Sequence, residues 1–213
     1  MASDSTFDPF LVLRGIDTLV VKQKKEMFEI LTGWESNNRF EIRTTDGNMI
    51  MYAAENTDFG LRYCLQNSRP FTIEVLTREG NAIMRLDADI NCCGQNVCVE
   101  IPPGRPFANI RKKRHFMTPS FFVTNVDTGD TVFRINFHAS AVLFGAADFD
   151  VKGADGQTVI GRISKKWGGL ARELFSDADY FGISMPADME VRWKAVLLAV
   201  LFHIDMTFYE RGH

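Results

Sequence analysis

The chain has 213 residues, of which 46% are hydrophobic and 24% charged, with a formal net charge of -3 and a pI near 5.8. This length, without a linker rich in Pro, Gly or Ser, favours a single domain with a large core. The acidic balance argues against general or sequence-specific nucleic-acid binding, which usually goes with a basic excess.

The beginning of the chain and its cysteines indicate an intracellular protein. The first ten residues, MASDSTFDPF, lack the basic and apolar regions of a secretory signal. We expect residues 1–10 to form a flexible tail and residues 11–213 to form the domain. The cysteines are Cys64, Cys92, Cys93 and Cys98. Their spacing fits neither a metal site nor a disulfide framework, so we expect reduced thiols.

Short alternating segments separated by turn dipeptides run from Thr18 to about Ser184, a pattern that indicates antiparallel β structure. Glycines follow Asp, Glu or Thr between several of these segments, where tight hairpin turns need residues that tolerate positive φ. These turn glycines are Gly47, Gly80, Gly129 and Gly156. The candidate strands are 18–22, 27–31, 40–45, 49–55, 71–77, 82–90, 97–101, 107–115, 120–126, 131–138, 148–153, 158–165 and 180–184.

A long apolar run, KAVLLAVLFHIDMTFYE, occupies residues 194–210. It is apolar on nearly every side of a helical wheel, so a helix formed from it must be surrounded. The run is shorter than the ~20 apolar residues of a bilayer span and contains His203 and Asp205, which favours burial in the protein over a membrane tail anchor. We expect this helix at about 187–209, with Pro186 at its start, and a short helix at 171–177.

Many antiparallel strands need closing, and a helix that is apolar on all sides needs enclosing. A closed antiparallel barrel of about twelve strands around the C-terminal helix meets both requirements. The expected fold class is therefore mainly β with a central helix.

The sequence resembles the phospholipid scramblase family, whose fold is tubby-like. The resemblance is carried by residues 20–42, AAENTD (53–58), SRPFTI (68–73), PPG (102–104) and most densely by 161–210. It implies calcium-dependent, energy-independent movement of phospholipids between membrane leaflets, at the cytoplasmic face of membranes and of the plasma membrane above all. It also implies that some members act in the nucleus or as adaptors, so the alternative is a non-transporting adaptor that binds lipid or protein. We expect no enzyme, because no catalytic constellation stands out.

The calcium segment of the family matches DADYFGISMPAD, residues 177–188. In a twelve-residue loop the acids would stand at positions one, three and twelve, with Gly182 at the bend. The candidate calcium ligands are Asp177, Asp179, Phe181, Ile183, Met185 and Asp188. In the alternative interpretation, Phe181, Ile183 and Met185 form the inner face of a strand, and such a strand cannot wrap an ion.

Three further segments have roles implied by the resemblance or by charge. Cys92 and Cys93 match an acylated cysteine cluster that would hold the protein at a membrane, or they are ordinary loop thiols. GRISKKWGGL resembles a nuclear-import segment read by an import receptor, with Lys165, Lys166 and Trp167 as its candidates, or it is a strand ending in a turn. The densest basic run is Arg111, Lys112, Lys113 and Arg114, an expected patch for anionic lipid headgroups or a solvated hairpin. A homo-oligomer is also expected if the helix leaves the barrel.

Overall fold

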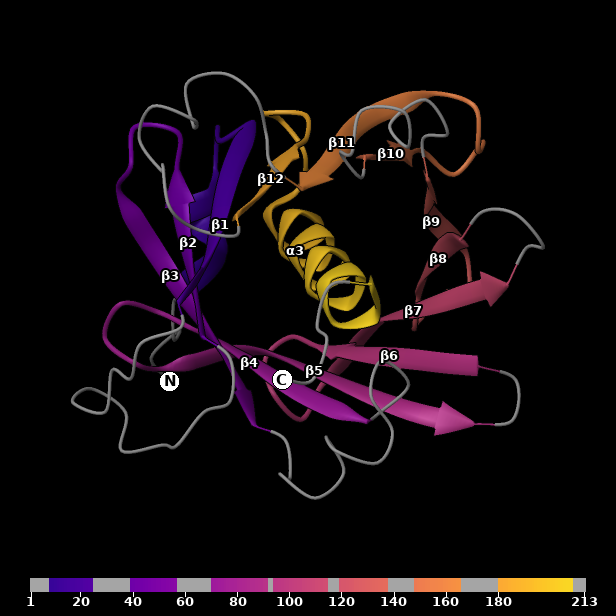
Figure 1. Cartoon of the computed structure of the whole chain (residues 1–213), viewed down its shortest axis with the longest axis horizontal. Coiled ribbons are helices and arrows are strands. Elements are labelled where there is room, and N and C mark those ends of the chain that lie inside the picture. The colour runs from indigo at the N-terminus through magenta and orange to yellow at the C-terminus, as the bar shows by residue number, and fades with distance from the viewer. Residues whose placement is uncertain are drawn as a thin grey trace, which may run out of the picture.

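The computed structural model describes residues 8–24, 39–56, 70–91, 94–114, 119–137, 148–165 and 180–208. In these residues twelve antiparallel strands form a closed barrel, and consecutive strands pair around the ring until β12 meets β1. The strands are β1 (Thr18–Lys24), β2 (Arg39–Thr44), β3 (Met49–Asn56), β4 (Phe71–Leu76), β5 (Ala82–Asn91), β6 (Gly94–Glu100), β7 (Pro106–Arg114), β8 (Pro119–Asn125), β9 (Thr131–Phe137), β10 (Asp148–Lys152), β11 (Val159–Lys165) and β12 (Tyr180–Ser184). The expected barrel is confirmed, and Figure 1 shows the helix α3 inside the ring.

Alternating side chains explain why these segments pair as strands. In β4, Phe71, Ile73 and Val75 are buried while the residues between them are partly exposed. The period of two gives each strand one apolar face, and closing the sheet turns all these faces toward one core. The candidate strand 27–31 and the candidate helix 171–177 lie outside the described residues.

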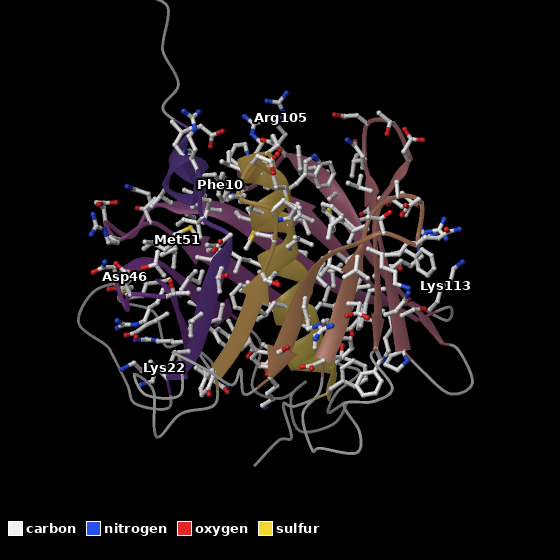
Figure 2. All side chains as sticks on the ribbon, turned by 90° about the horizontal axis from the view of Figure 1, so that it is seen from above. Phe10, Lys22, Asp46, Met51, Arg105 and Lys113 are labelled. Carbon is white, nitrogen blue, oxygen red and sulfur yellow. The ribbon has the colours of Figure 1, made fainter. Side chains whose placement is uncertain are left out.

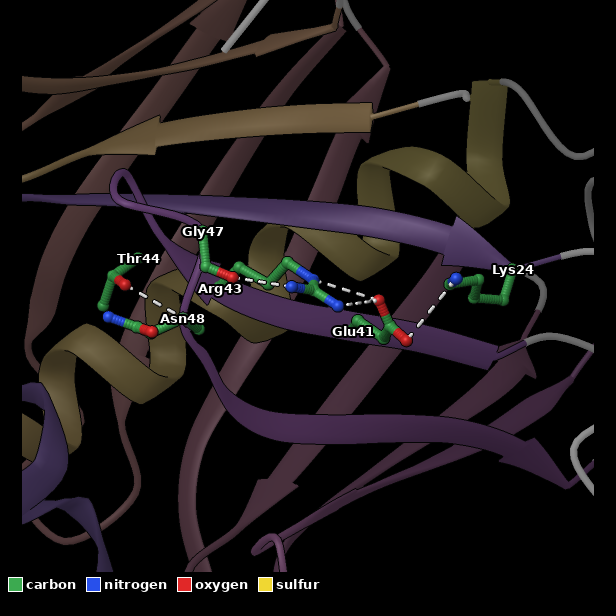
Figure 3. Close-up of polar contacts among 6 residues, drawn as sticks. All are labelled: Lys24, Glu41, Arg43, Thr44, Gly47 and Asn48. Carbon is green, nitrogen blue, oxygen red and sulfur yellow. Dashed lines mark hydrogen bonds and ion pairs between the residues drawn. The ribbon is translucent and has the colours of Figure 1, made fainter. Parts of the chain in front are cut away.

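The hairpin between β2 and β3 shows how the turns are fixed (Figure 3). Gly47 has a φ of 87°, and the Thr44 amide donates to the Asn48 carbonyl at 2.9 Å. Arg43 donates to the Gly47 carbonyl at 2.6 Å and to Glu41, which also pairs with Lys24 at 3.7 Å. The predicted turn glycines are confirmed, because Gly80, Gly129 and Gly156 also have positive φ.

The helix α3 (Val191–Phe208) fills the barrel, and every residue from Lys194 to Thr207 is buried. The expected start near residue 187 is wrong by about one turn. Glu190 stands just before the helix, and its carboxylate accepts from the amides of Arg192 at 3.1 Å and Trp193 at 3.3 Å. Pro186 lies in the preceding turn, where its carbonyl accepts from the Met189 amide. Glu190 satisfies the first free amides of the helix, so the helix begins after it.

The barrel has two ends, which we name by their connections. At the turn end lie the short described turns between β2 and β3, β4 and β5, β6 and β7, β8 and β9, and β10 and β11. The far end carries the opposite strand ends, including Lys24, Arg114 and Lys165. The helix α3 runs from the turn end, where Trp193 packs on Phe107 with ring centroids 4.8 Å apart, to the far end at Phe208.

The 3-10 helix η1 (Pro9–Leu13) closes the turn end of the barrel. Phe10 and Leu13 are buried in the core, and the Asp8 side chain caps η1 by accepting from the Phe10 amide at 3.0 Å. Figure 2 shows Phe10 and Arg105 at the same end of the barrel. The expected tail over residues 1–10 is therefore wrong for residues 8–10, which join the barrel because Phe10 has a large apolar side chain to bury.

Candidate functional site

Lys194 anchors α3 to the turn end of the barrel. Its side chain is fully buried, and its Nζ donates to the carbonyls of Ile16 at 2.6 Å, Ala187 at 2.8 Å and Leu13 at 3.1 Å. Burial lowers the pKa of Lys194, and the nearby Asp17 and Asp188 carboxylates oppose that shift. An ammonium group has three donors, so this site satisfies all of them.

The far end of the lumen is polar, in contrast to the apolar core behind it. Glu55 follows the inward residues Met51 and Ala53 of β3, and Lys112 follows Ala108 and Ile110 on the inner face of β7. Lys165, on the inner face of β11, pairs in register with Phe181 of β12. The polar side chains at this end are Glu55, Gln95, Lys112, Lys165, His203, Asp205 and Thr207, and of these His203 contacts Gln95. The last turns of α3 are thus surrounded by groups of both charges.

His203 is a fully buried titratable group near the end of α3. Its Nε2 lies 3.3 Å from Gln95 Oε1, and its ring lies edge-on to Phe121 with centroids 5.1 Å apart. Burial, reinforced by the Lys112 ammonium, lowers the pKa of His203 to about 3. The imidazole is therefore neutral at physiological pH.

The basic run Arg111 to Arg114 is divided between the two faces of β7. Lys112 points into the barrel, where its Nζ lies 4.6 Å from the ring centroid of Phe208. Arg111 and Lys113 are exposed on the outer face. The expected patch is thus not one continuous surface, because neighbouring strand residues point to opposite faces.

Residues 180–188, the described part of the calcium segment, do not form a single ion-binding loop. The side chains of Phe181, Ile183 and Met185 contain no oxygen and are buried in the core, so they cannot bind a calcium ion. Asp188 lies at the turn end beside Lys194, whereas β12 begins at the far end with Tyr180. About 13 Å of strand separates Tyr180 from Ser184, far more than the ~2.4 Å between an ion and its ligands. The strand interpretation of residues 180–184 is correct, and Asp177 and Asp179 lie outside the described residues.

Among the nuclear-import and cysteine candidates, the structure describes only Lys165 and Cys98. Lys165 ends β11, with its Nζ 5.3 Å from the ring centroid of Phe181. Lys166, Trp167, Cys92 and Cys93 lie outside the described residues. Cys98 is half-buried on β6, and burial raises the pKa of its thiol, which makes it a poor nucleophile.

Two features are absent from the described ranges. No group of three or more His, Cys, Asp or Glu side chains there could hold a metal ion. In the same part of the chain, no helix combines the length and the apolar character needed to cross a membrane.

Sequence reasoning missed Lys194 and Lys112 as structural positions. Lys194 is the first residue of the apolar run 194–210, so the sequence suggested a solvent-exposed flank. A lysine next to buried apolar residues can instead indicate buried hydrogen-bond acceptors for its ammonium group. Lys112 could be placed only once the register had shown which face of β7 is the inner one.

A closed antiparallel barrel around one buried helix is the tubby-like architecture. A solved protein from Arabidopsis thaliana has a similar fold, with a TM-score of 0.55 over 93% of this chain and 96% of that chain at 12% identity. The Scramblase family model matches residues 6–211, so the chain belongs to the phospholipid scramblase family.

The similarity of the chain to individual phospholipid scramblases supports this membership. The chain is 37% identical to mouse phospholipid scramblase 1 over 206 residues, which cover 93% of this chain and 63% of that protein. It is 38% identical to cattle phospholipid scramblase 2 over 208 residues, covering 93% and 70%, and 30% identical to human phospholipid scramblase 4, covering 92% and 62%. The chain thus spans less than two thirds of the length of mouse phospholipid scramblase 1.

Proposed function

We propose that the protein moves phospholipids between the two leaflets of a membrane, without an energy source and in response to calcium. The observation that supports this is the similarity of 93% of the chain to phospholipid scramblases of mouse and cattle. Anionic phospholipids at the cytoplasmic face of the plasma membrane are the expected partners.

A second candidate function is that of an adaptor that binds lipid or protein without transporting lipid, with a possible nuclear pool. The burial of α3 on all sides favours it, because a helix that stays inside the barrel offers a headgroup no path through ~30 Å of hydrocarbon. Nuclear import through Lys165 would require this inward side chain to be reached by a receptor.

Reconstitution into liposomes with a fluorescent lipid distinguishes the two functions. Quenching the outer leaflet leaves a protected signal, which a scramblase diminishes and an adaptor preserves. We expect calcium to accelerate this loss. If purified, membrane-bound protein causes no calcium-stimulated loss, the adaptor function is favoured.

Calcium dependence is tested with two variants. We expect the double variant Asp177→Ala and Asp179→Ala to lose calcium stimulation. Asp188→Ala is the matched control and should retain it, because Asp188 lies beside Lys194 at the turn end. Calcium stimulation that persists in the double variant would place the ion elsewhere.

Acylation of Cys92 and Cys93 is a separate part of the proposal. One acyl chain binds membranes only marginally and two bind firmly, so both cysteines are needed. Replacing both by Ser should move the protein from the membrane to the soluble fraction of cells. An unchanged membrane fraction together with no detectable acyl chain would exclude this anchor.

A further inference from the structure

The outer face of strands β7 to β10 carries a row of cations around one aromatic ring. Arg111 lies opposite Phe122, Phe122 opposite Arg134, and Arg134 opposite Lys152. Neighbouring strands are ~4.8 Å apart, so these four side chains leave the sheet within about 15 Å of one another. Lys113 projects from the same face of β7, two residues after Arg111. We name Arg111, Lys113, Phe122, Arg134 and Lys152 the Phe122 patch.

Two of these cations cover the ring of Phe122. The Nζ of Lys113 lies 4.5 Å from the ring centroid, and the Cζ of Arg134 lies 5.8 Å from it. One cation comes from the strand before β8 and the other from the strand after it. The ring therefore holds the cations in place and is not a free surface on which another ring could stack.

The four cations of the Phe122 patch have no carboxylate within ion-pair distance among the described residues. Elsewhere on the described surface, five basic side chains pair with carboxylates at 2.8 to 3.7 Å, whereas others such as Arg78 and Arg105 do not; the five are Lys24, Arg43, Arg85, Arg162 and Arg192. Arg111, Lys113, Arg134 and Lys152 form no ion pair within the described residues. On β10 and in the turn after it, Asp150 pairs with Arg162 and Asp155 interacts electrostatically with Arg134. Like charges directly opposite in a sheet, such as Arg134 and Lys152, destabilise it unless an anion intervenes.

Two buried polar atoms beside the patch have no hydrogen-bond partner among the described residues. Ser120 lies opposite Lys113 and next to Asn136, is 7% exposed, and has an unsatisfied Oγ. The Nε of Arg134 is also buried and unsatisfied. Buried polar groups normally find a partner, so these two donors are available to a ligand on this face. A hydroxyl and a guanidinium donor beside unpaired cations suit phosphate oxygens.

We propose that the Phe122 patch is the surface through which the barrel docks on the anionic phospholipids of a membrane. Headgroup phosphates lie between the cations and accept from Ser120 and Arg134. The wall β7–β10 then faces the bilayer, and β1–β3 lie on the other side of α3 (Figure 1). Figure 2 shows Lys113 on the outside of the barrel.

A membrane fits this surface better than a nucleic acid does. Single strands bind by stacking bases on exposed aromatic rings, and Phe122 is covered by Lys113 and Arg134. The cations stand side by side on a sheet wall, as contact with a planar layer of headgroups requires. This inference rests on the proposed function in one respect, that the protein acts at a membrane. Docking itself requires neither lipid movement nor calcium.

The test is cosedimentation with vesicles of phosphatidylcholine containing about 30% phosphatidylserine, compared with phosphatidylcholine alone, in a calcium chelator. We expect the protein to bind the anionic vesicles, and the double variant Arg111→Gln and Lys113→Gln to bind about tenfold less. A second variant, Arg134→Gln with Lys152→Gln, should show a similar loss. The matched control, Lys24→Gln with Arg85→Gln, removes two exposed charges from other strands and should bind as the unmodified protein does.

Three results would overturn the proposal. The first is equal binding of the patch and control variants to anionic vesicles. The second is a loss of binding when inorganic phosphate replaces chloride at equal ionic strength, which would indicate a site for free phosphate. The third is preferential binding of a single-stranded oligonucleotide that depends on the patch. Vesicle binding without lipid movement in the reconstituted protein would leave the docking surface intact and contradict the proposed function alone.

Discussion

Lys194 Nζ lies 2.6 Å from the carbonyl oxygen of Ile16, although the two residues are 178 positions apart in the chain. This contact joins the first turn of the central helix to the segment that precedes the first strand. Removing the ammonium group would leave the carbonyls of Ile16 and Ala187 without this donor, and the Leu13 carbonyl with only the Ile16 amide.

We therefore expect Lys194→Met to lower the free energy of unfolding by about 3 kcal/mol or more, since bonds to a charged donor are lost and buried acceptors remain. Methionine keeps the length and apolar stem of the side chain. The measurement is urea unfolding followed by tryptophan fluorescence, to which Trp193, packed between Phe107 and Phe133, contributes.

Arg192→Met is the control, because Arg192 pairs with Asp8 at 3.5 Å and its side chain is 47% exposed. Exposed ion pairs of this kind contribute less than about 1 kcal/mol. Equal losses in both variants would show that Lys194 does not anchor the helix.

Acid should destabilise the protein through His203. Its pKa is about 3 when folded and near 6.5 when unfolded, so between these values the unfolded chain binds a proton that the folded protein excludes. The contribution of His203 to the free energy of unfolding is therefore fully present above pH ~6.5. It decreases as the pH falls toward 3, by at most ~1.4 kcal/mol per pH unit.

The unfolding free energy at a series of pH values measures this slope. His203→Gln lacks the titrating ring and should flatten the curve in this window. An identical slope in the variant would assign the acid sensitivity to other groups.

Gly161 on β11 has no room for a side chain. A Cβ there would lie 2.2 Å from the Ser184 carbonyl oxygen, a backbone atom that cannot swing away. Gly161→Ala should lower stability by about 2 kcal/mol or more, as other overpacked positions do.

Gly153→Ala is the matched control, because its Cβ would meet only Asp155 Oδ1 at 3.5 Å. This change should leave stability within about 0.5 kcal/mol or raise it slightly. Thermal unfolding of both variants measures the difference in stability between them. A Gly161→Ala protein as stable as the Gly153→Ala control would contradict the expectation.

Phe202 connects the helix with the barrel wall, its ring centroid lying 5.0 Å from that of Phe40. Phe202→Ala should cost about 3–5 kcal/mol through the cavity it leaves. Val159→Ala, at a position 52% exposed, should cost little. A small effect of Phe202→Ala would mean that the helix is not tightly packed in the barrel.

Most of the fold could be predicted because its signals are local. Alternating apolar residues and turn glycines such as Gly47 and Gly129 marked the strands, and the apolar run 194–210 required an enclosure. The helix start was misjudged because Glu190 is not among the residue types that usually cap helices.

The site was harder to predict because its contacts join distant parts of the chain. Alternation placed Lys112 and Lys113 on opposite faces of β7 but did not indicate which face was the inner one. The opposition of Phe122 to Arg111 and of Arg134 to Lys152 follows from the register of four strands, which the sequence does not specify. The partners of Lys194 depend on the closure of the barrel between β1 and β12.

The enclosure of α3 also bears on how the protein is made. The twelve strands precede α3 in the chain, so the ribosome synthesises them first. Until α3 has been synthesised, the apolar inner faces of the strands lack their packing partner. A nascent chain interrupted before Phe208 would have the strands of the barrel without the complete helix that fills its core. Chaperones would bind the apolar residues left exposed. Mutations that slow the arrival of this helix should therefore reduce the yield of protein in cells more than they reduce the stability of the molecules that finish folding.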